Sequence, residues 1–305
     1  MTASPQQLNT KRRFRRLVKR GEVPSHPLLI PLVHAAAAQI DNLDVREFLT
    51  DATQMAKSLV AMNQAIGVDA IVCFYDRSAV AEAVGAQLDW RVYPPEISGK
   101  PRQPIPQDIA SLLDTHDRIQ TGVEVLTRLQ ATQTDETLFA VVITGPATLA
   151  GQLMDDNDTS VLETCGRLVS ESARIFAEAG AHVIFIVESE TTVQGNRAWQ
   201  LAINPVINVA RFYSAIPVLV PNGHEQTHVE AFYREVPTGL LVCNQRGVPD
   251  GEPGGVILPL QPREWAVEPT RGFSLITTPG EVPLDSDIPD LRAACQRFRN
   301  EFATS

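Results

Sequence analysis

The stretch AIVCFYD (70–76) decides the fold, because a run of strand-forming, mostly apolar residues leads into Tyr75 and then into Asp76. Continuous apolar runs of this kind are typical of strands that are buried on both faces of a parallel sheet. A carboxylate at the end of such a strand either marks where the chain meets water or is presented by the strand to a ligand. The stretch alone leaves both interpretations of Asp76 open.

Similar apolar runs recur along the chain. They are LLIPLVH (28–34), LFAVVITGP (138–146), HVIFIVES (182–189), PVLVPN (217–222), GLLVCN (239–244), GVILPL (255–260) and FSLITT (273–278). Helical patterns lie between or after them, at about 44–66, 107–131, 158–180, 196–214, 225–236 and 287–302. This alternation predicts a parallel sheet with helical crossovers, and eight strands in one series favour a (β/α)8 TIM barrel.

No repeat or interdomain linker interrupts the series, so we predict one α/β barrel domain over residues 1–305. Residues 1–25 are predicted to be a basic N-terminal helical extension, in which KRRFRR (11–16) forms a solvated amphipathic helix. Gly67 and Gly180 each follow a predicted helix and precede a strand, which predicts left-handed caps. The proline-rich segment 90–106 has no periodicity and is predicted to be a long loop.

Composition narrows the function classes. The formal net charge of −10 and the pI near 5.1 disfavour nucleic acid and anionic membranes as partners, since both require a cationic surface. The four cysteines form no CxxC pair, which argues against a zinc ribbon or a thioredoxin-type site. No apolar run is long enough for a membrane span, and no signal peptide is visible, so we expect a cytoplasmic enzyme that acts on a small molecule. A homodimer remains among the assemblies that the sequence allows.

In a (β/α)8 barrel the functional residues lie at the carboxyl ends of the strands. Those ends carry His34, Asp76, Gly145 with Pro146, Glu188 with Ser189, Asn222 with His224, Cys243 with Asn244, and the segment from Thr277 to Glu281. Neither a phosphate-binding glycine loop nor a GxSxG nucleophile elbow is present, which excludes two common enzyme classes.

These strand-end residues also have structural interpretations. Asp76 could cap the next helix or pair with Arg77, and Glu188 could cap a helix. His34 could be a hydrogen-bonded histidine at the rim. Cys243 is of a type that is more often a small buried residue than a nucleophile. His224 has a second histidine one turn later, but an acidic partner in HExxH order is absent, so it is a weak metal signal.

Five stretches, in this order, resemble the uroporphyrinogen decarboxylase superfamily over nearly the whole chain. They are RFRRLVKRGEVPSHPLLIPL (13–32), GVDAIVCFYDRSAVAEAVGAQLDW (67–90), ITGPATLAG (143–151), AGAHVIFIVES (179–189) and LITTPGEVPLDSDIPDLRAACQRF (275–298). The resemblance implies a (β/α)8 barrel. In the decarboxylase itself it implies catalysis without a cofactor, with Asp76 at the position of the carboxylate that binds the pyrrole NH groups of a tetrapyrrole and stabilises developing positive charge.

The chain departs from the decarboxylase pattern at several positions. Where that enzyme has a Met-Arg-Gln-Ala-Gly-Arg stretch whose arginines hold substrate carboxylates, this chain has VHAAAAQ (33–39), and the first arginine after this stretch is Arg46. A family tyrosine aligns with Gln152 or a neighbour, and a C-terminal histidine with Thr277 or Thr278. Uroporphyrinogen itself is therefore a poor fit as the substrate.

The other branch of the superfamily consists of zinc-dependent methyltransferases that work with corrinoid proteins or thiols. Their pattern places His-x-Cys after strand five and a cysteine after strand eight, whereas these strands here end in VPNGH (220–224) and TTPGE (277–281). No pattern supports a metal site. A set of Glu188, His224, Cys243 and Glu281 could be assembled from strand ends as a low-ranking alternative.

The sequence thus predicts a carbon–carbon lyase of the decarboxylase type, related to porphyrin metabolism, without a cofactor. Its predicted catalytic residues are Asp76, Glu188, His34 and His224, and replacement of Asp76 by Asn is expected to abolish turnover while the fold stays intact. The predicted substrate-binding residues are Tyr75, Arg77, Gly145, Pro146, Ser189, Asn222 and Cys243. The alternatives are a methyltransferase or demethylase that uses a corrinoid or folate partner, with or without zinc, and a barrel that binds a ligand without catalysis.

Overall fold

The computed structural model describes residues 10–20, 26–133, 136–154, 159–189, 197–222, 239, 241–244, 254–265 and 273–303. Its strands are β1 (Leu28–Leu29), β2 (Ala70–Tyr75), β3 (Gln87–Asp89), β4 (Glu96–Gly99), β5 (Leu138–Thr144), β6 (Val183–Ser189), β7 (Ile216–Asn222), β8 (Leu241–Asn244), β9 (Gly254–Ile257) and β10 (Phe273–Thr277). Its α-helices are α1 (Thr10–Arg20), α2 (Val45–Thr50), α3 (Ala52–Ile66), α4 (Ala79–Ala83), α5 (Ile109–Asp114), α6 (Asp117–Thr132), α7 (Pro146–Leu153), α8 (Thr159–Glu178), α9 (Arg197–Phe212) and α11 (Ile288–Ala303). Two short 3-10 helices are η1 (Ala35–Asp41) and η3 (Pro262–Glu264).

The chain folds into two compact units, and each is assembled from segments that are distant in sequence. The first unit consists of residues 1–73, 125–140 and 241–305, and the second consists of residues 74–124 and 141–240. Strands β2 and β5 contribute residues to both units. The prediction of a single domain over the whole chain stays a prediction.

The first unit contains parallel strands in the order β1, β10, β9, β8. Leu29 pairs with Ile276, and the N–H of Ile30 extends this ladder by donating to the carbonyl of Ile276 at 2.8 Å. On its other side, the carbonyl of Leu29 accepts a hydrogen bond from the N–H of Asp69 at 3.0 Å, one residue before β2 begins. Strand β1 therefore has the last strand on one side and the start of the second strand on the other, as a (β/α)8 barrel requires.

Helix α1 packs on the first unit through its apolar face, which buries Phe14 and Leu17. The guanidinium of Arg13 forms an ion pair with Asp69 at 2.6 Å and donates to the carbonyl of Pro27 at 3.0 Å. The prediction of an amphipathic helix is confirmed for residues 10–20, and one of its basic residues connects the helix to the start of β2.

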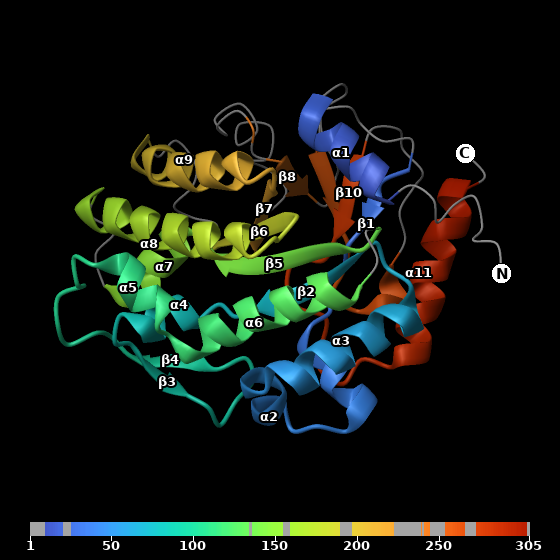
Figure 1. Ribbon diagram of the computed structural model, residues 1–305, viewed down its shortest axis with the longest axis horizontal. Coiled ribbons are helices and arrows are strands. Elements are labelled where there is room, and N and C mark those ends of the chain that lie inside the picture. The colour runs from blue at the N-terminus through green and yellow to red at the C-terminus, as the bar shows by residue number, and fades with distance from the viewer. Residues whose placement is uncertain are drawn as a thin grey trace. The chain divides into compact units, whose positions relative to one another are not determined.

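The second unit contains the parallel strands β7 and β6 beside the ends of β5 and β2. Val183 to Ser189 of β6 pair in register with Ile216 to Asn222 of β7. Every residue of β2 and β5 is buried, which explains their uninterrupted apolar sequence. Helices α8 and α9 pack against each other along these strands (Figure 1). Gly166 allows this close approach, because a Cβ there would lie 2.6 Å from the carbonyl oxygen of Ala202.

Three predicted elements differ in detail. The helix predicted over 44–66 is two helices, because the side chain of Asp51 accepts hydrogen bonds from the N–H groups of Thr53 and Gln54 and starts α3 anew. The helix predicted over 107–131 is also divided, into α5 and α6. The predicted loop 90–106 contains β4, which pairs antiparallel with β3. The predicted helix 225–236 lies outside the described residues.

The predicted fold class is confirmed: parallel strands alternate with helices along the described chain, and an N-terminal helix precedes them. The predicted left-handed caps are also confirmed, with φ of 69° at Gly67 and 98° at Gly180. Among the described helices, none combines the length and the apolar character that crossing a membrane demands.

Candidate functional site

The carboxyl ends of β2, β5 and β6 meet at one edge of the second unit. The carbonyl of Arg77 accepts a hydrogen bond from the hydroxyl of Thr144 at 2.8 Å, which links the ends of β2 and β5. The N–H of Gly145 donates to the carbonyl of Val187 at 2.8 Å, which links β5 to β6. This edge carries five of the predicted site residues: Asp76, Arg77, Gly145, Pro146 and Glu188.

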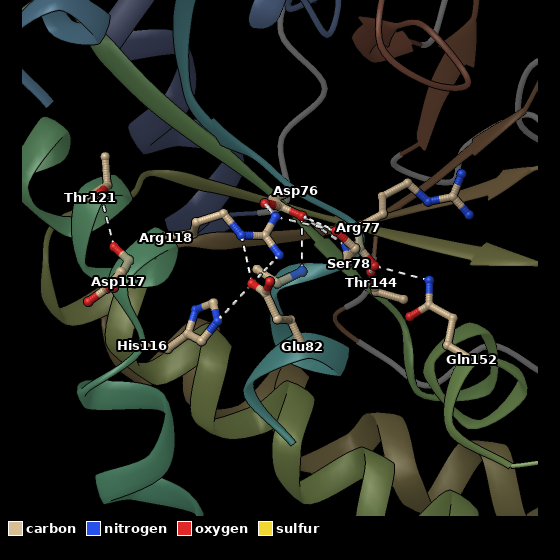
Figure 2. A network of polar contacts seen from close by, with 11 residues as sticks. Asp76, Arg77, Ser78, Glu82, His116, Asp117, Arg118, Thr121, Thr144 and Gln152 are labelled. Atoms are coloured by element: carbon tan, nitrogen blue, oxygen red, sulfur yellow. Dashed lines mark hydrogen bonds and ion pairs between the residues drawn. The ribbon is translucent and has the colours of Figure 1, made fainter. Parts of the chain in front are cut away.

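The carboxylate of Asp76 is fully engaged by the protein itself (Figure 2). Its Oδ1 atom accepts hydrogen bonds from the N–H and the hydroxyl of Ser78 and from the N–H of Ala79, each at 2.9 Å. These contacts hold the first turn of α4. Its Oδ2 atom forms an ion pair with the guanidinium of Arg118 on α6. The structure therefore shows the capping role for Asp76, and the partner is Arg118 and not Arg77.

Arg118 connects Asp76 to a second acid. Its Nε and Nη2 atoms donate to Oε2 of Glu82 at 2.9 and 2.6 Å, and Nε2 of His116 lies 3.1 Å from the same oxygen. The hydrogen bond with His116 is the largest cause that lowers the pKa of Glu82 to about 2; burial opposes it, and the hydrogen bond and charge of Arg118 lower the pKa further. The guanidinium of Arg118 also lies over the ring of Trp90, 4.9 Å from its centroid.

This ionic network is the part of the edge that sequence reasoning missed. Arg118 follows Asp76 by 42 positions and Glu82 by 36, and it lies on α6, whereas Asp76 follows β2 and Glu82 lies on α4. Local spacing carries no signal for such contacts, because they depend on how α6 packs beside the end of β2. The sequence offered helix capping only as one alternative for Asp76, beside pairing with Arg77 and a role in catalysis.

Arg77 points away from this network (Figure 2). Its carbonyl is held from two sides, by Thr144 and by Nε2 of Gln152 at 3.0 Å. Its side chain is half-buried, and its Nε atom is buried without a hydrogen-bond partner. Within the part of the chain that the structure describes, no carboxylate or carbonyl contacts this guanidinium. The neighbouring Tyr75 is buried in β2.

Glu188 is completely buried at the end of β6 and accepts four hydrogen bonds. The donors are the N–H groups of Ala147 and Thr148 at 3.0 and 2.9 Å, the hydroxyl of Thr148 at 2.8 Å, and the indole Nε1 of Trp199 at 2.7 Å. Burial raises the pKa of Glu188, and these donors oppose the shift. The carboxylate thus accepts hydrogen bonds from backbone N–H groups at the amino end of α7, where negative charge is favoured.

Gly145 and Pro146 form the turn into α7, and Glu188 explains why the turn needs a glycine. A Cβ atom on Gly145 would lie 2.2 Å from Cδ of Glu188. Pro146 begins the helix, where its missing N–H costs no hydrogen bond. This turn and Glu188 are mutually dependent parts of the fold.

His34 lies in the first unit, after β1. Its ring contacts Phe48 edge-on, and its Nδ1 atom is 3.9 Å from Oε1 of Glu281, which also accepts a hydrogen bond from the N–H of Ala35. Burial lowers the pKa of His34 to about 3, against a smaller opposing effect of the Cys73 backbone. Neither ring nitrogen makes a well-formed hydrogen bond within the described residues. His34 is therefore neutral at physiological pH, with hydrogen-bonding capacity to spare.

Two buried threonines, Thr277 and Thr278, lie at the end of β10, the strand that pairs with β1. Thr278 accepts a hydrogen bond from the N–H of Leu32 at 3.0 Å and donates to the carbonyl of Gly280 at 2.7 Å. The hydroxyl of Thr277 is buried without a partner within the described residues. Thr278 thus joins the end of β10 to the chain that follows β1.

Several predicted site residues cannot be placed. His224 lies outside the described residues, as do the side chains of Ser189, Asn222 and Cys243. The backbones of Ser189 and Asn222 are paired across β6 and β7. Among the described side chains, no three His, Cys, Asp or Glu residues come close enough to hold a metal ion. Of the low-ranking metal set, Glu188 is saturated by its four donors.

Three comparisons with known proteins bear on this arrangement. The sequence model of a family described as uroporphyrinogen decarboxylase matches residues 9–221. No protein of curated function matches the chain. A solved structure of a methyltransferase from Methanosarcina mazei is similar to this chain, with a TM-score of 0.74 at 16% identity, and covers 96% of this chain and 99% of that chain.

A second similar structure is a B12-independent methionine synthase from Shewanella sp. W3-18-1, in complex with selenomethionine. Its TM-score is 0.50 at 13% identity, with 93% of this chain and 98% of that chain covered. At 16% and 13% identity, the similarity to these two structures shows a shared fold and not a shared reaction. Reactions diversify on one fold through the residues at the strand ends, so the reaction has to be argued from those residues.

Proposed function

Because the chain belongs to the uroporphyrinogen decarboxylase family, we propose that it is an enzyme that moves a one-carbon group on a small organic substrate, and that the group is methyl. Both reactions of the superfamily, decarboxylation and methyl transfer, occur at the strand ends of the same barrel. The choice between them rests on what the strand-end residues of this chain are able to do.

The proposal rests on the contacts that the carboxylate of Asp76 already makes within the protein. Decarboxylation of the tetrapyrrole type needs a carboxylate at the end of β2 that accepts ring NH groups and stabilises the developing cation. In this chain both oxygens of Asp76 are already used, by Ser78 and Ala79 on one side and by Arg118 on the other. The positive charge of Arg118 at the carboxylate also opposes the approach of a second cation. Asp76 therefore serves the fold.

The candidate proton donors, His34 and Glu188, also favour methyl transfer over decarboxylation. Decarboxylation requires a proton donor for the carbon that loses carbon dioxide. His34 is neutral at physiological pH, since its pKa of about 3 leaves it no proton to give as an acid. Glu188 is held by four donors and faces the amino end of α7. Methyl transfer to a nucleophile does not require such a donor.

In methyl transfer from a corrinoid to a thiolate, the methyl group moves as a cation. With a methylated corrinoid as the methyl-donor substrate, both electrons of the broken bond would stay with the corrinoid, and the sulfur of the acceptor would supply the pair for the new bond. The zinc-dependent members activate the thiol by lowering its pKa. The described residues do not fit a zinc site, so we assign no step to zinc. The methyl carrier we propose is a corrinoid or folate.

The reaction is tested by incubating the purified protein anaerobically with methylcobalamin and a small thiol, and following the absorption spectrum. We expect conversion to cob(I)alamin that depends on the protein, together with the methylated thiol as detected by mass spectrometry. A parallel sample receives uroporphyrinogen III, and its products are separated by chromatography. Loss of carboxyl groups from that tetrapyrrole, without methyl transfer, would overturn the proposal. Elemental analysis of the same preparation reports whether zinc accompanies the activity.

A further inference from the structure

Arg77 is a cationic side chain at the strand ends with which no described acidic side chain forms an ion pair. Its backbone is fixed on the carbonyl side by two hydrogen bonds, from Thr144 at 2.8 Å and from Gln152 at 3.0 Å. Its guanidinium has no acceptor within the described residues, and its Nε atom is buried. A buried donor without an acceptor is costly, and the cost is larger for a charged group.

Arg118, the other arginine at this edge, has a guanidinium whose hydrogen-bond donors are satisfied by acids of the protein. Arg118 is used by Asp76 and Glu82 and lies over Trp90. The side chain of Arg77 points in another direction from the same strand end (Figure 2). Asp76 and Glu82 are therefore both paired with Arg118, and among the described residues the guanidinium of Arg77 has no acceptor.

We propose that the guanidinium of Arg77 binds a carboxylate of the substrate. This rests on the proposed function in one respect, that the substrate is a small molecule bound at the strand ends. A guanidinium presents parallel N–H donors that match the two oxygens of a carboxylate. Arg77 is thus a specificity-determining residue, and the substrate class is a small monocarboxylic acid.

One carboxylate fits this site better than a phosphate or several carboxylates. Arg77 contributes a single charge, and the other arginine of the edge, Arg118, is neutralised by two acids. Gln152 and Thr144 use their donors on the backbone of Arg77. Within the described edge, no second unused cation is available for a dianion. The same limit explains why a polycarboxylated tetrapyrrole is a poor fit.

The two hydrogen bonds to the carbonyl of Arg77 also fix the backbone position from which its side chain extends. Thr144 ends β5, and Gln152 lies on α7, so the residue is held by two elements besides its own strand. A binding group that is held in place before the ligand arrives loses less conformational entropy when it binds. Gln152 and Thr144 are in this sense positioning residues for the anion site.

The test is a binding measurement that requires no turnover. Propionate serves as the probe, with the neutral propionamide and with inorganic phosphate as comparisons, and binding is measured by ligand-observed NMR titration. We expect propionate to bind the wild-type protein and propionamide to bind about tenfold more weakly or not at all, since one charge-assisted contact is lost. Phosphate is expected to bind no more tightly than propionate.

The variants are Arg77→Gln and Arg77→Lys, with Arg91→Gln as the matched control, because Arg91 is an exposed arginine of the same unit. We expect Arg77→Gln to weaken propionate binding about tenfold or more, Arg77→Lys to weaken it less, and Arg91→Gln to leave it unchanged. Circular dichroism and the melting temperature show that each variant is folded.

Propionate affinity that is equal in the wild type and in folded Arg77→Gln would overturn the inference. Tighter, Arg77-dependent binding of phosphate would also overturn it, since the ligand would then be a phosphate. Because no catalysis is measured, loss of the methyl-transfer proposal alone would leave these outcomes unaffected. The two proposals therefore fail separately.

Discussion

The carboxylate of Asp76 and the guanidinium of Arg118 form a buried ion pair, although 42 positions separate them in the sequence. Both side chains are only 7% exposed. The pair joins the end of β2 to α6, and the same guanidinium reaches Glu82 on α4. The end of β2, α4 and α6 are thus joined at one charged group.

Replacing Arg118 by methionine should therefore destabilise the protein strongly. The substitution leaves the carboxylate of Asp76 buried without its counter-charge, and breaking a buried pair in this way costs about 3–5 kcal/mol. Urea unfolding at neutral pH measures the change. In the exposed pair of Arg91 with Asp89, Arg91→Gln should cause no measurable change. Equal stability of the wild type and Arg118→Met would show that the buried pair does not hold the edge together.

A second prediction concerns the turn at Gly145. Gly145→Ala places a methyl group 2.2 Å from Cδ of Glu188, and such overpacking costs about 1–3 kcal/mol. Gly151→Ala is the matched control, because a Cβ there meets nothing within 4 Å and the residue lies in α7. The control should be unchanged or more stable by up to about 1 kcal/mol, owing to helix propensity. Melting temperatures of the two variants should shift in different directions or by clearly different amounts.

Because His34 is buried in its neutral form, we expect the free energy of unfolding to fall in mild acid. Its pKa of about 3 in the folded protein lies below the value near 6.5 of an unfolded chain. The unfolded chain therefore binds a proton first, and the stabilisation present above pH 6.5 is lost as the pH falls toward 3. Between pH 7 and pH 5 this amounts to about 2 kcal/mol. Urea unfolding of His34→Gln should show a smaller dependence on pH over this interval, and an unchanged dependence would mean that His34 does not titrate as described.

Trp199 provides a test of the Glu188 anchor. Trp199→Phe keeps an aromatic ring but removes the indole donor that lies 2.7 Å from the buried carboxylate. Loss of a hydrogen bond to a buried charge should cost about 1.5–3 kcal/mol. Trp265→Phe is a suitable comparison, because Trp265 is equally buried but donates to the carbonyl of Pro259, which is uncharged. A larger loss in Trp265→Phe would argue against a special role of the Glu188 carboxylate.

The sequence predicted the buried strands well and the polar contacts poorly. AIVCFY (70–75) and LFAVVI (138–143) carry no charged residue because both faces of β2 and β5 are buried, and this pattern is local. The break at Asp51 and the short helix α4 depend on single capping side chains, which periodicity does not detect. Asp76 was recognised as a strand-end carboxylate, but its partner Arg118 could not be found, because the contact depends on tertiary packing.

The same limit applies to Glu188. Its position at the end of β6 was predicted, together with the Gly145–Pro146 turn, yet nothing local indicated that the acid and the turn touch. His34 was placed at the end of the first strand, and the depth of its burial followed only from the structure. The predicted catalytic roles of these residues and of His224 stay predictions.

Asp76→Asn tests most directly whether this residue serves the fold or the reaction. Asparagine keeps the oxygen that caps α4 and removes the charge that pairs with Arg118. Urea unfolding and turnover in the methylcobalamin assay are measured on the same preparation. We expect the free energy of unfolding to fall by about 1.5–3 kcal/mol, with turnover of the folded variant within about threefold of wild type, a barrier change below about 1 kcal/mol. Abolished turnover with unchanged stability would show instead that Asp76 takes part in the chemistry.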